Sequence, residues 1–100
     1  MSAEARNDVL QCLKAAMPEL RRRFRVRTLS IFGSVARGEA EEGSDVDVLV
    51  EFEEQVGLFQ LARLRRHLVE LLGRPVDLGT PASLRPRIRS AALDEAVRVA

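Results

Sequence analysis

Two aspartates at alternate positions of an apolar stretch are the residues of this chain best suited to do chemistry. Asp45 and Asp47 alternate with valines in the segment SDVDVLV. If this segment is a β-strand, both carboxylates leave the same face, with their Cα atoms roughly 6.6 Å apart. Two anions this close need a cation between them, and Mg²⁺ is the hard ion that carboxylates and phosphate oxygens bind together. The spacing therefore predicts a magnesium site for a phosphate-bearing substrate.

A glycine and a serine that precede the aspartates supply the phosphate end of such a site. Gly33 has no Cβ, so the backbone can come close to a ligand, and the Ser34 hydroxyl can donate a hydrogen bond to a phosphate oxygen. We expect residues 34–37 to begin a short helix, whose N-terminus favours a phosphate. The stretch from residue 29 to residue 50 thus has the order of parts of a metal–triphosphate site.

Purely structural explanations stand beside these chemical ones. Aspartates on a strand often face water, because many sheets are solvated on one face. We interpret Glu39, Glu41 and Glu42 as part of a solvated polar connection rather than as metal ligands. His67 lies away from the leucine stripe of its expected helix, so we interpret it as an exposed helix residue. Cys12, the single cysteine, has no evident base nearby, and we interpret it as a buried structural thiol.

Taken together, these residues resemble the GSxxRGxxxxxSDxD signature of the polymerase-β-like nucleotidyltransferases. The short chain resembles their minimal nucleotidyltransferase branch, and the resemblance covers most of the sequence. A later acid on a short apolar stretch, residues 75–78, resembles the third carboxylate of that family. The matching residues are Gly33, Ser34, Arg37, Gly38, Ser44, Asp45, Asp47 and Asp77.

The resemblance implies an α/β fold with a small mixed β-sheet flanked by helices on one side, in a single domain over residues 1–100. It implies that the strand of Asp77 lies beside the strand of Asp45 and Asp47, and that these three acids form the catalytic and metal-binding set around Mg²⁺. Asp77 would also help to deprotonate the acceptor hydroxyl. Such a set can support phosphoryl transfer by positioning and electrostatics alone.

The resemblance also implies a nucleotide-binding set in which Gly33 and Ser34 hold the terminal phosphates of ATP. Ser44 belongs to the same set through its place in the signature. Arg37 has two interpretations that the sequence leaves open: it touches phosphate, or it forms an ion pair with a glutamate such as Glu39.

In the minimal branch, the resemblance implies an antitoxin that transfers AMP from Mg-ATP to a tyrosine of a HEPN-type toxin. This chain contains no tyrosine, so it cannot modify a tyrosine of its own. One alternative is a non-catalytic antitoxin that neutralises the toxin by covering it. Another is a small-molecule nucleotidyltransferase, but the chain lacks a segment for binding such an acceptor.

The composition is that of a small globular protein. The chain has 100 residues, of which 46% are hydrophobic and 31% charged, and its net charge of +1 argues against nucleic acid as the main partner. We find no membrane span and no signal peptide, and we expect a cytoplasmic protein. The arginines of residues 21–27 are interpreted as solvated cations at a helix end, with contact to a protein or RNA as the alternative. Homo- or hetero-oligomeric assembly is left open.

Hydrophobic periodicity and turn residues predict the elements that must position the site. Pro18 is expected to break or tighten the end of the first helix. The expected elements are a helix over 2–23, strands over 26–32, 45–52 and 76–78, a helix over 57–72 that stops at Gly73, and a last helix from Ser83 through Val97.

Overall fold

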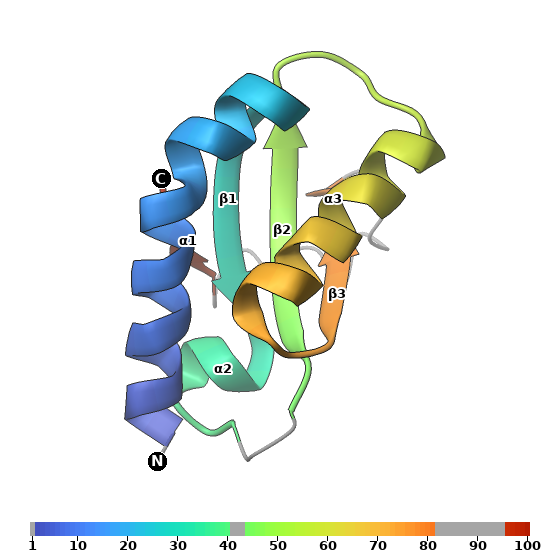
Figure 1. Cartoon of the computed structure of the whole chain (residues 1–100). Coiled ribbons are helices and arrows are strands. Elements are labelled where there is room, and N and C mark those ends of the chain that lie inside the picture. The colour runs from blue at the N-terminus through green and yellow to red at the C-terminus, as the bar shows by residue number, and fades with distance from the viewer. Residues whose placement is uncertain (1, 41–43, 82–95) are drawn as a thin grey trace.

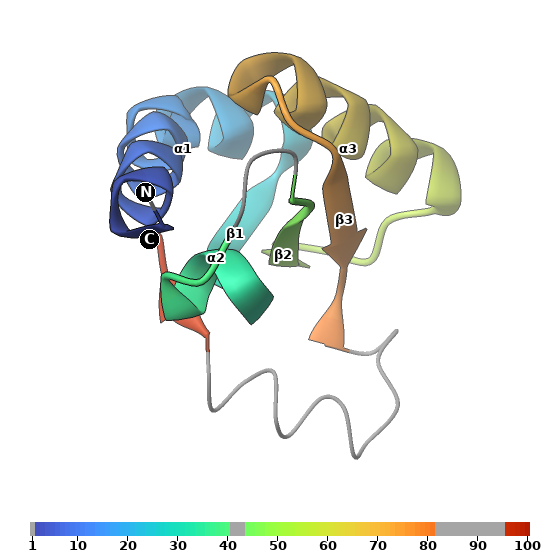
Figure 2. The ribbon, with the colours of Figure 1, turned by 90° about the horizontal axis from the view of Figure 1, so that it is seen from below.

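The computed structural model describes residues 2–40, 44–81 and 96–100 and contains a four-stranded sheet with helices packed against it (Figure 1). Helices α1 and α3 lie on the same face of the sheet (Figure 2), which confirms the predicted α/β class. Within the described part of the chain, no helix is long and apolar enough to cross a membrane. The elements are α1 (Ser2–Phe24), β1 (Val26–Phe32), α2 (Gly33–Arg37), β2 (Val46–Phe52), α3 (Leu58–Leu72), β3 (Val76–Gly79) and β4 (Val97–Arg98).

The sheet is mixed, with the strand order β3-β2-β1-β4. Strands β1 and β2 are antiparallel neighbours, while β2 and β3 run parallel. A parallel pair needs a crossover between its strands, and α3 supplies it. The short β4 pairs with β1 on the far side. The strand that carries Asp47 therefore lies in the interior of the sheet.

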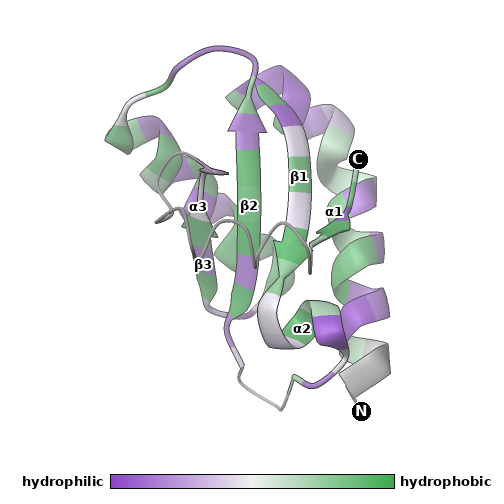
Figure 3. Cartoon of the chain, turned by 180° about the vertical axis from the view of Figure 1, so that it is seen from behind, coloured by the Kyte–Doolittle hydropathy of each residue, from purple (hydrophilic) through white to green (hydrophobic). Residues whose placement is uncertain are grey.

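Alternation along β2 separates the core from the polar face. Val46, Val48 and Val50 are fully buried and belong to the core that α1 and α3 cover. Asp47 stands between them and leaves the opposite face, because successive side chains of a strand point to opposite sides. Seen from behind in Figure 3, β2 carries a hydrophilic band at its end next to α2. The apolar residues of β2 thereby determine which face receives the acid.

Helix α1 runs without interruption past Pro18, so the predicted break is wrong. Proline removes the hydrogen bond to the carbonyl of Lys14, one turn earlier. Met17, Leu20 and Phe24, on either side of Pro18, are buried in the core. Their burial offsets the missing hydrogen bond and carries the helix on to Phe24.

Helix α3 ends as the sequence predicts, with Gly73 in the left-handed region at φ 65 and its N–H bonded to the Val69 carbonyl. The prediction of an exposed His67 is wrong, because this residue is half-buried with its ring centroid 5.3 Å from that of Phe24. The helical pattern of α3 identified the side that carries the leucines. It did not show that α1 covers a second side of α3, where His67 lies.

Cys12 is half-buried rather than fully buried, and its Sγ donates to the Leu71 carbonyl at 3.6 Å. It links α1 to the last turn of α3. The thiol therefore lies where α1 and α3 meet, as a structural residue would, but it is not fully enclosed.

The end of the chain differs from the prediction. Val97 lies in β4, where Val97 pairs with Ile31 and Arg98 pairs with Ser30, so the expected helix does not extend to it. Residues 83–95 of that predicted helix lie outside the described residues. A strand of two residues is too short to show an alternating pattern, so the sequence does not predict it.

Burial differs strongly along α3, and stability should follow it. Leu64 is fully buried, whereas Leu58 on the same helix is 84% exposed. We expect Leu64→Ala to lower the free energy of unfolding by roughly 2–5 kcal/mol, because it removes buried methyl groups and leaves a cavity. Leu58→Ala is the matched control and should change it by less than about 0.5 kcal/mol. Urea unfolding followed by circular dichroism measures both, and equal losses would contradict this view of the core.

Candidate active site

The parallel pairing of β2 with β3 places two predicted site residues side by side. Asp47 is the direct register partner of Asp77. Neighbouring strands lie about 4.8 Å apart, so the Cα atoms of the two acids are at roughly that distance. Val46 and Val76, one position earlier, are both buried, so the two acids share the opposite face of the sheet. The expected neighbourhood of these strands is confirmed.

Asp45 precedes β2 rather than lying within it, since the strand begins at Val46. Its side chain is exposed, as is that of Asp77, whereas Asp47 is half-buried. Its charge nevertheless acts on Asp47. Asp45 and Asp77 therefore both lie near enough to Asp47, at one end of β2, for their charges to act on it.

Gly33 is fitted against Asp47. It adopts φ +71, a left-handed conformation that side chains rarely tolerate, and a Cβ built there would overlap Oδ2 of Asp47 and lie 3.1 Å from its Cγ. Phe32, the residue before it, is the register partner of Asp47 on β1. The start of α2 and the acid of β2 are thus in direct contact, and only glycine permits this approach.

The pKa of Asp47 is raised above its ordinary value. Burial is the largest cause, followed by the charges of Asp77 and Asp45, while the positive charge of Arg37 acts in the opposite direction. Burial penalises the ionised form, and like charges nearby do the same. The site therefore concentrates negative charge around a partly desolvated carboxylate.

The structure shows one of the two interactions considered for Arg37. Its Nε lies 3.1 Å from Oε2 of Glu39, which is the ion pair that the sequence left as an alternative. Both side chains are substantially exposed, so the pair adds little stability. Ser34 lies in α2 and Ser44 directly precedes Asp45, and both are half-buried. Their assignment to phosphate binding stays a prediction.

Sequence reasoning missed a residue that positions the site. Arg65 is an exposed residue of α3 whose Nε donates to the Val76 carbonyl at 2.8 Å. This bond holds β3 to the crossover helix next to Asp77. No local signal in the sequence identifies it, because the contact depends on how α3 folds back over the sheet.

The donor set suits a hard divalent cation. Among the residues that the structure describes, no three acidic, histidine or cysteine side chains are close enough to form a complete ligand group. The three aspartates nevertheless offer only oxygen donors, which Mg²⁺ prefers together with substrate oxygens. A cation would also offset the mutual repulsion that raises the pKa of Asp47. The residues present therefore fit the ion, although their role as ligands stays a prediction.

Comparison with known proteins gives consistent results. Residues 13–99 match the family described as nucleotidyltransferase domain. The protein adenylyltransferase MntA of Thermococcus cleftensis is 46% identical over 92 residues, which cover 92% of this chain and 93% of that protein.

Solved structures share the fold. A structure assigned as a minimal nucleotidyltransferase superposes with a TM-score of 0.76 at 43% identity, covering 90% of this chain and 92% of that one. A chain from the complex of a tri-AMPylated Shewanella oneidensis HEPN toxin with an MNT antitoxin superposes with a TM-score of 0.62 at 17% identity. That match covers 100% of this chain and 72% of the other, and at this identity it supports the fold alone.

The contact between Gly33 and Asp47 predicts a measurable difference between two glycines. Gly33 and Gly38 both have positive φ, but a Cβ at Gly38 would meet nothing within 4 Å. Gly38→Ala should therefore cost only the backbone strain, about 1–2 kcal/mol of unfolding free energy. Gly33→Ala should cost clearly more, because Asp47 must also move. Chemical denaturation of both variants provides the comparison, and an equal cost would show that Gly33 and Asp47 are not in contact.

The raised pKa of Asp47 predicts a pH-dependent stability. An acid whose pKa is higher in the folded state binds its proton more tightly there, so ionisation favours unfolding. Stability from this group is present below the unfolded pKa and is lost as the pH rises through the folded one. In buffer with EDTA, Asp47→Asn should therefore unfold at a higher temperature than wild type near pH 7, and the difference should shrink toward pH 3. Asp8→Asn, at an exposed position of α1, is the control and should show no such trend. A lower melting temperature for Asp47→Asn at pH 7 would contradict the assignment.

Proposed function

Because the chain belongs to the nucleotidyltransferase domain family, as a minimal nucleotidyltransferase, we propose that it transfers AMP from ATP to a hydroxyl of a HEPN-type toxin. The chain would then act as the antitoxin of that toxin, with a tyrosine as the modified residue. Support comes from the relative named a protein adenylyltransferase and from the similar fold in a complex of an AMPylated HEPN toxin with its antitoxin.

One observation carries the proposal: Asp47 and Asp77 are paired in register beside Gly33. A nucleotidyl transfer needs carboxylates next to a place where a triphosphate can approach the backbone. Both requirements meet at one end of β2. A sheet whose aspartates merely faced water would not require a glycine in a left-handed conformation against one of them.

We assign the metal-binding role to Asp45, Asp47 and Asp77. When bound there, Mg²⁺ supplies neutralisation of the charge that develops on the phosphate oxygens. Gly33 and Ser34 would bind the terminal phosphates, through close backbone approach and the serine hydroxyl.

Asp77 is proposed to accept the proton of the acceptor hydroxyl. Its side chain is exposed, so a hydroxyl from another molecule can reach it. The deprotonated oxygen forms a bond to the α-phosphorus of ATP, the bond from that phosphorus to the bridging oxygen breaks, and pyrophosphate leaves. Arg65, bonded to the Val76 carbonyl, keeps the strand of this acid in place.

The acceptor belongs to a separate molecule. No tyrosine occurs in this chain, so a tyrosine acceptor must come from a partner.

Single-turnover transfer to a purified HEPN-type toxin tests the proposal. Intact mass should show the toxin gaining one or more AMP units when ATP and Mg²⁺ are present. Asp77→Asn keeps the shape of the side chain but removes the proton acceptor, so we expect transfer to slow at least about 10²-fold while toxin binding persists. Asp8→Asn on α1 is the control and should transfer at the wild-type rate.

Each contrary result is informative. Near-normal transfer by Asp77→Asn would leave this acid a structural residue. A toxin that is neutralised without any gain in mass would favour an antitoxin that acts by covering its partner.

A further inference from the structure

Two large apolar side chains are exposed to solvent at the start of α3. Leu58 is 84% exposed and Phe59 is 90% exposed, although other leucines of the same helix are buried. Single exposed apolar residues are common, but an adjacent leucine and phenylalanine on a helix end form a small patch. Phenylalanine in particular is enriched where proteins bind one another. Packing in the core therefore does not explain why these two side chains are apolar.

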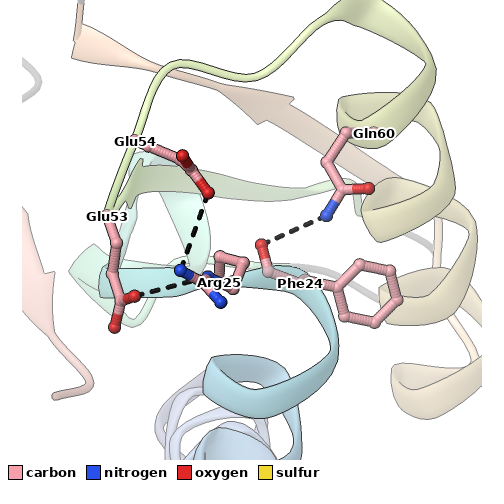
Figure 4. Close-up of polar contacts among 5 residues, drawn as sticks. All are labelled: Phe24, Arg25, Glu53, Glu54 and Gln60. Atoms are coloured by element: carbon pink, nitrogen blue, oxygen red, sulfur yellow. Dashed lines mark hydrogen bonds and ion pairs between the residues drawn. The ribbon is translucent and has the colours of Figure 1, made fainter.

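Polar contacts tie the chain on either side of the patch to the end of α1 (Figure 4). Gln60 donates through Nε2 to the Phe24 carbonyl at 3.2 Å, which ties the first turn of α3 to the end of α1. Arg25 lies between the acids of the preceding loop, with its Nε 3.5 Å from Glu53 and its Nη2 3.7 Å from Glu54. The backbone N–H of Glu53 also donates to the Arg25 carbonyl at 2.9 Å.

Arg25 makes these contacts from a strained backbone. Its φ is 60, and it is the one residue other than glycine with a positive φ among those described. Such a conformation costs about 1–2 kcal/mol and persists where the surroundings hold it. The start of α3 is therefore pre-organised, which lowers the entropy lost when a partner binds.

A basic groove lies along the side of α3 that Phe59 shares with Arg63 and Arg66, although neither Leu58 nor Phe59 lines it. It has a volume of about 550 Å³, and it lies between the end of α1 and the outer side of α3. Its lining residues are Arg23, Phe24, Gln60, Arg63, Arg66, His67 and Glu70. Three arginines thus face one glutamate, and the groove carries a net positive charge.

The arginines of the groove differ in their partners. Arg23 lies 2.9 Å from Glu19 and Arg66 lies 3.7 Å from Glu70. Arg63 forms no ion pair with the described residues. Phe59, Arg63 and Arg66 follow one another at positions i, i+4 and i+7, so they share one stripe of the helix. An apolar anchor is therefore followed by positive charge along a single line.

This surface lies away from the candidate active site. Asp47 is near the start of β2, whereas Phe52 at its end leads into the loop before α3. These two positions are about 17 Å apart along the strand. The groove is also on the helix side of the sheet, opposite the face of the aspartates. A partner bound here would leave the catalytic edge open.

The chemistry of the surface points to one kind of occupant. A symmetric contact with a second copy would set the arginines of one stripe against those of the other. Single-stranded nucleic acid stacks successive bases on several aromatic faces, whereas Phe24 in the groove is only 6% exposed and Phe59 beside it offers a single ring. An apolar helix face edged with carboxylates meets both the exposed pair and the arginines.

We propose that Leu58, Phe59 and the groove beside them form the docking surface for a protein partner that presents an apolar helix face edged with carboxylates. The identity of that partner rests on the proposed function, which makes it the HEPN-type toxin. The chain then holds the toxin on the helix side of the sheet, and the segment of the toxin that carries the acceptor tyrosine must extend from there to the aspartates at the other end of β2.

Binding of the purified HEPN-type toxin to variants of the full chain tests this surface. Phe59→Ser should weaken binding at least about 30-fold, as for a central interface anchor. Arg63→Glu should weaken it at least about tenfold and reduce its sensitivity to salt, because a charge-complementary contact is lost. Titration calorimetry at two salt concentrations measures both effects.

Two matched controls accompany these variants. Leu71→Ser changes another exposed leucine of α3 about 18 Å away, and Lys14→Glu reverses an exposed charge on α1. Both should bind the toxin as wild type does. Circular dichroism establishes that each variant is folded.

The outcomes separate this surface from the proposed function. If Phe59→Ser and Arg63→Glu lose binding and the two controls do not, the docking surface is supported. If wild-type chain binds the toxin but the toxin gains no AMP, only the proposed transfer is overturned. Wild-type affinity in both variants overturns the surface and leaves the transfer intact. If sedimentation analysis shows that the wild-type chain is dimeric and the Phe59→Ser variant is monomeric, the docking surface is overturned in favour of self-association. If the chain binds single-stranded RNA, and Arg63→Glu abolishes that binding while the affinity for the toxin is unchanged, the docking surface is overturned in favour of nucleic acid.

Discussion

The register between β2 and β3 is the constraint on which the rest of the molecule depends. It sets Asp47 beside Asp77, and a shift by one residue would move one of these acids to the opposite face. The buried valines on the other side of the same strands oppose such a shift, because they would lose their places in the core. Packing on one face of the sheet therefore maintains the chemistry on the other.

The proximity of Asp45, Asp47 and Asp77 lowers the stability of the chain when no cation or ligand is bound. Asp47 loses part of its hydration and faces two like charges, and Arg37 offsets only some of this. Active sites often place charges in this way, since a bound substrate or ion later supplies the missing opposite charge. Gly33 belongs to the same arrangement, because its missing side chain leaves the space that Asp47 occupies. The residues that destabilise this end of the sheet are therefore the same ones to which we assign the transfer.

Helix α3 connects the two ends of the molecule. Its buried leucines pack on the sheet, and Arg65 holds β3 through the Val76 carbonyl. Its first turn is anchored to α1 by Gln60 and carries the exposed apolar pair. In the proposed function, the same helix would link recognition of a partner at one end to the position of Asp77 at the other. Both tasks are compatible because they use different sides of one rigid element.

The sequence by itself determined the elements with strong local patterns. Strand β1 and the crossover helix with its Gly73 stop were predictable, because alternation, helical spacing and a terminal glycine are features of neighbouring residues. The contact of Gly33 with Asp47 was not predicted. The family signature added the expected approach of Asp77. Only the tertiary structure decided the course of α1 past Pro18, the contact of His67 with Phe24 and the pairing of β4 with β1. It likewise decided that Arg37 pairs with Glu39 and that Arg65 reaches β3. These outcomes depend on which distant surfaces meet, and the free energy of burial between them overrides local preference.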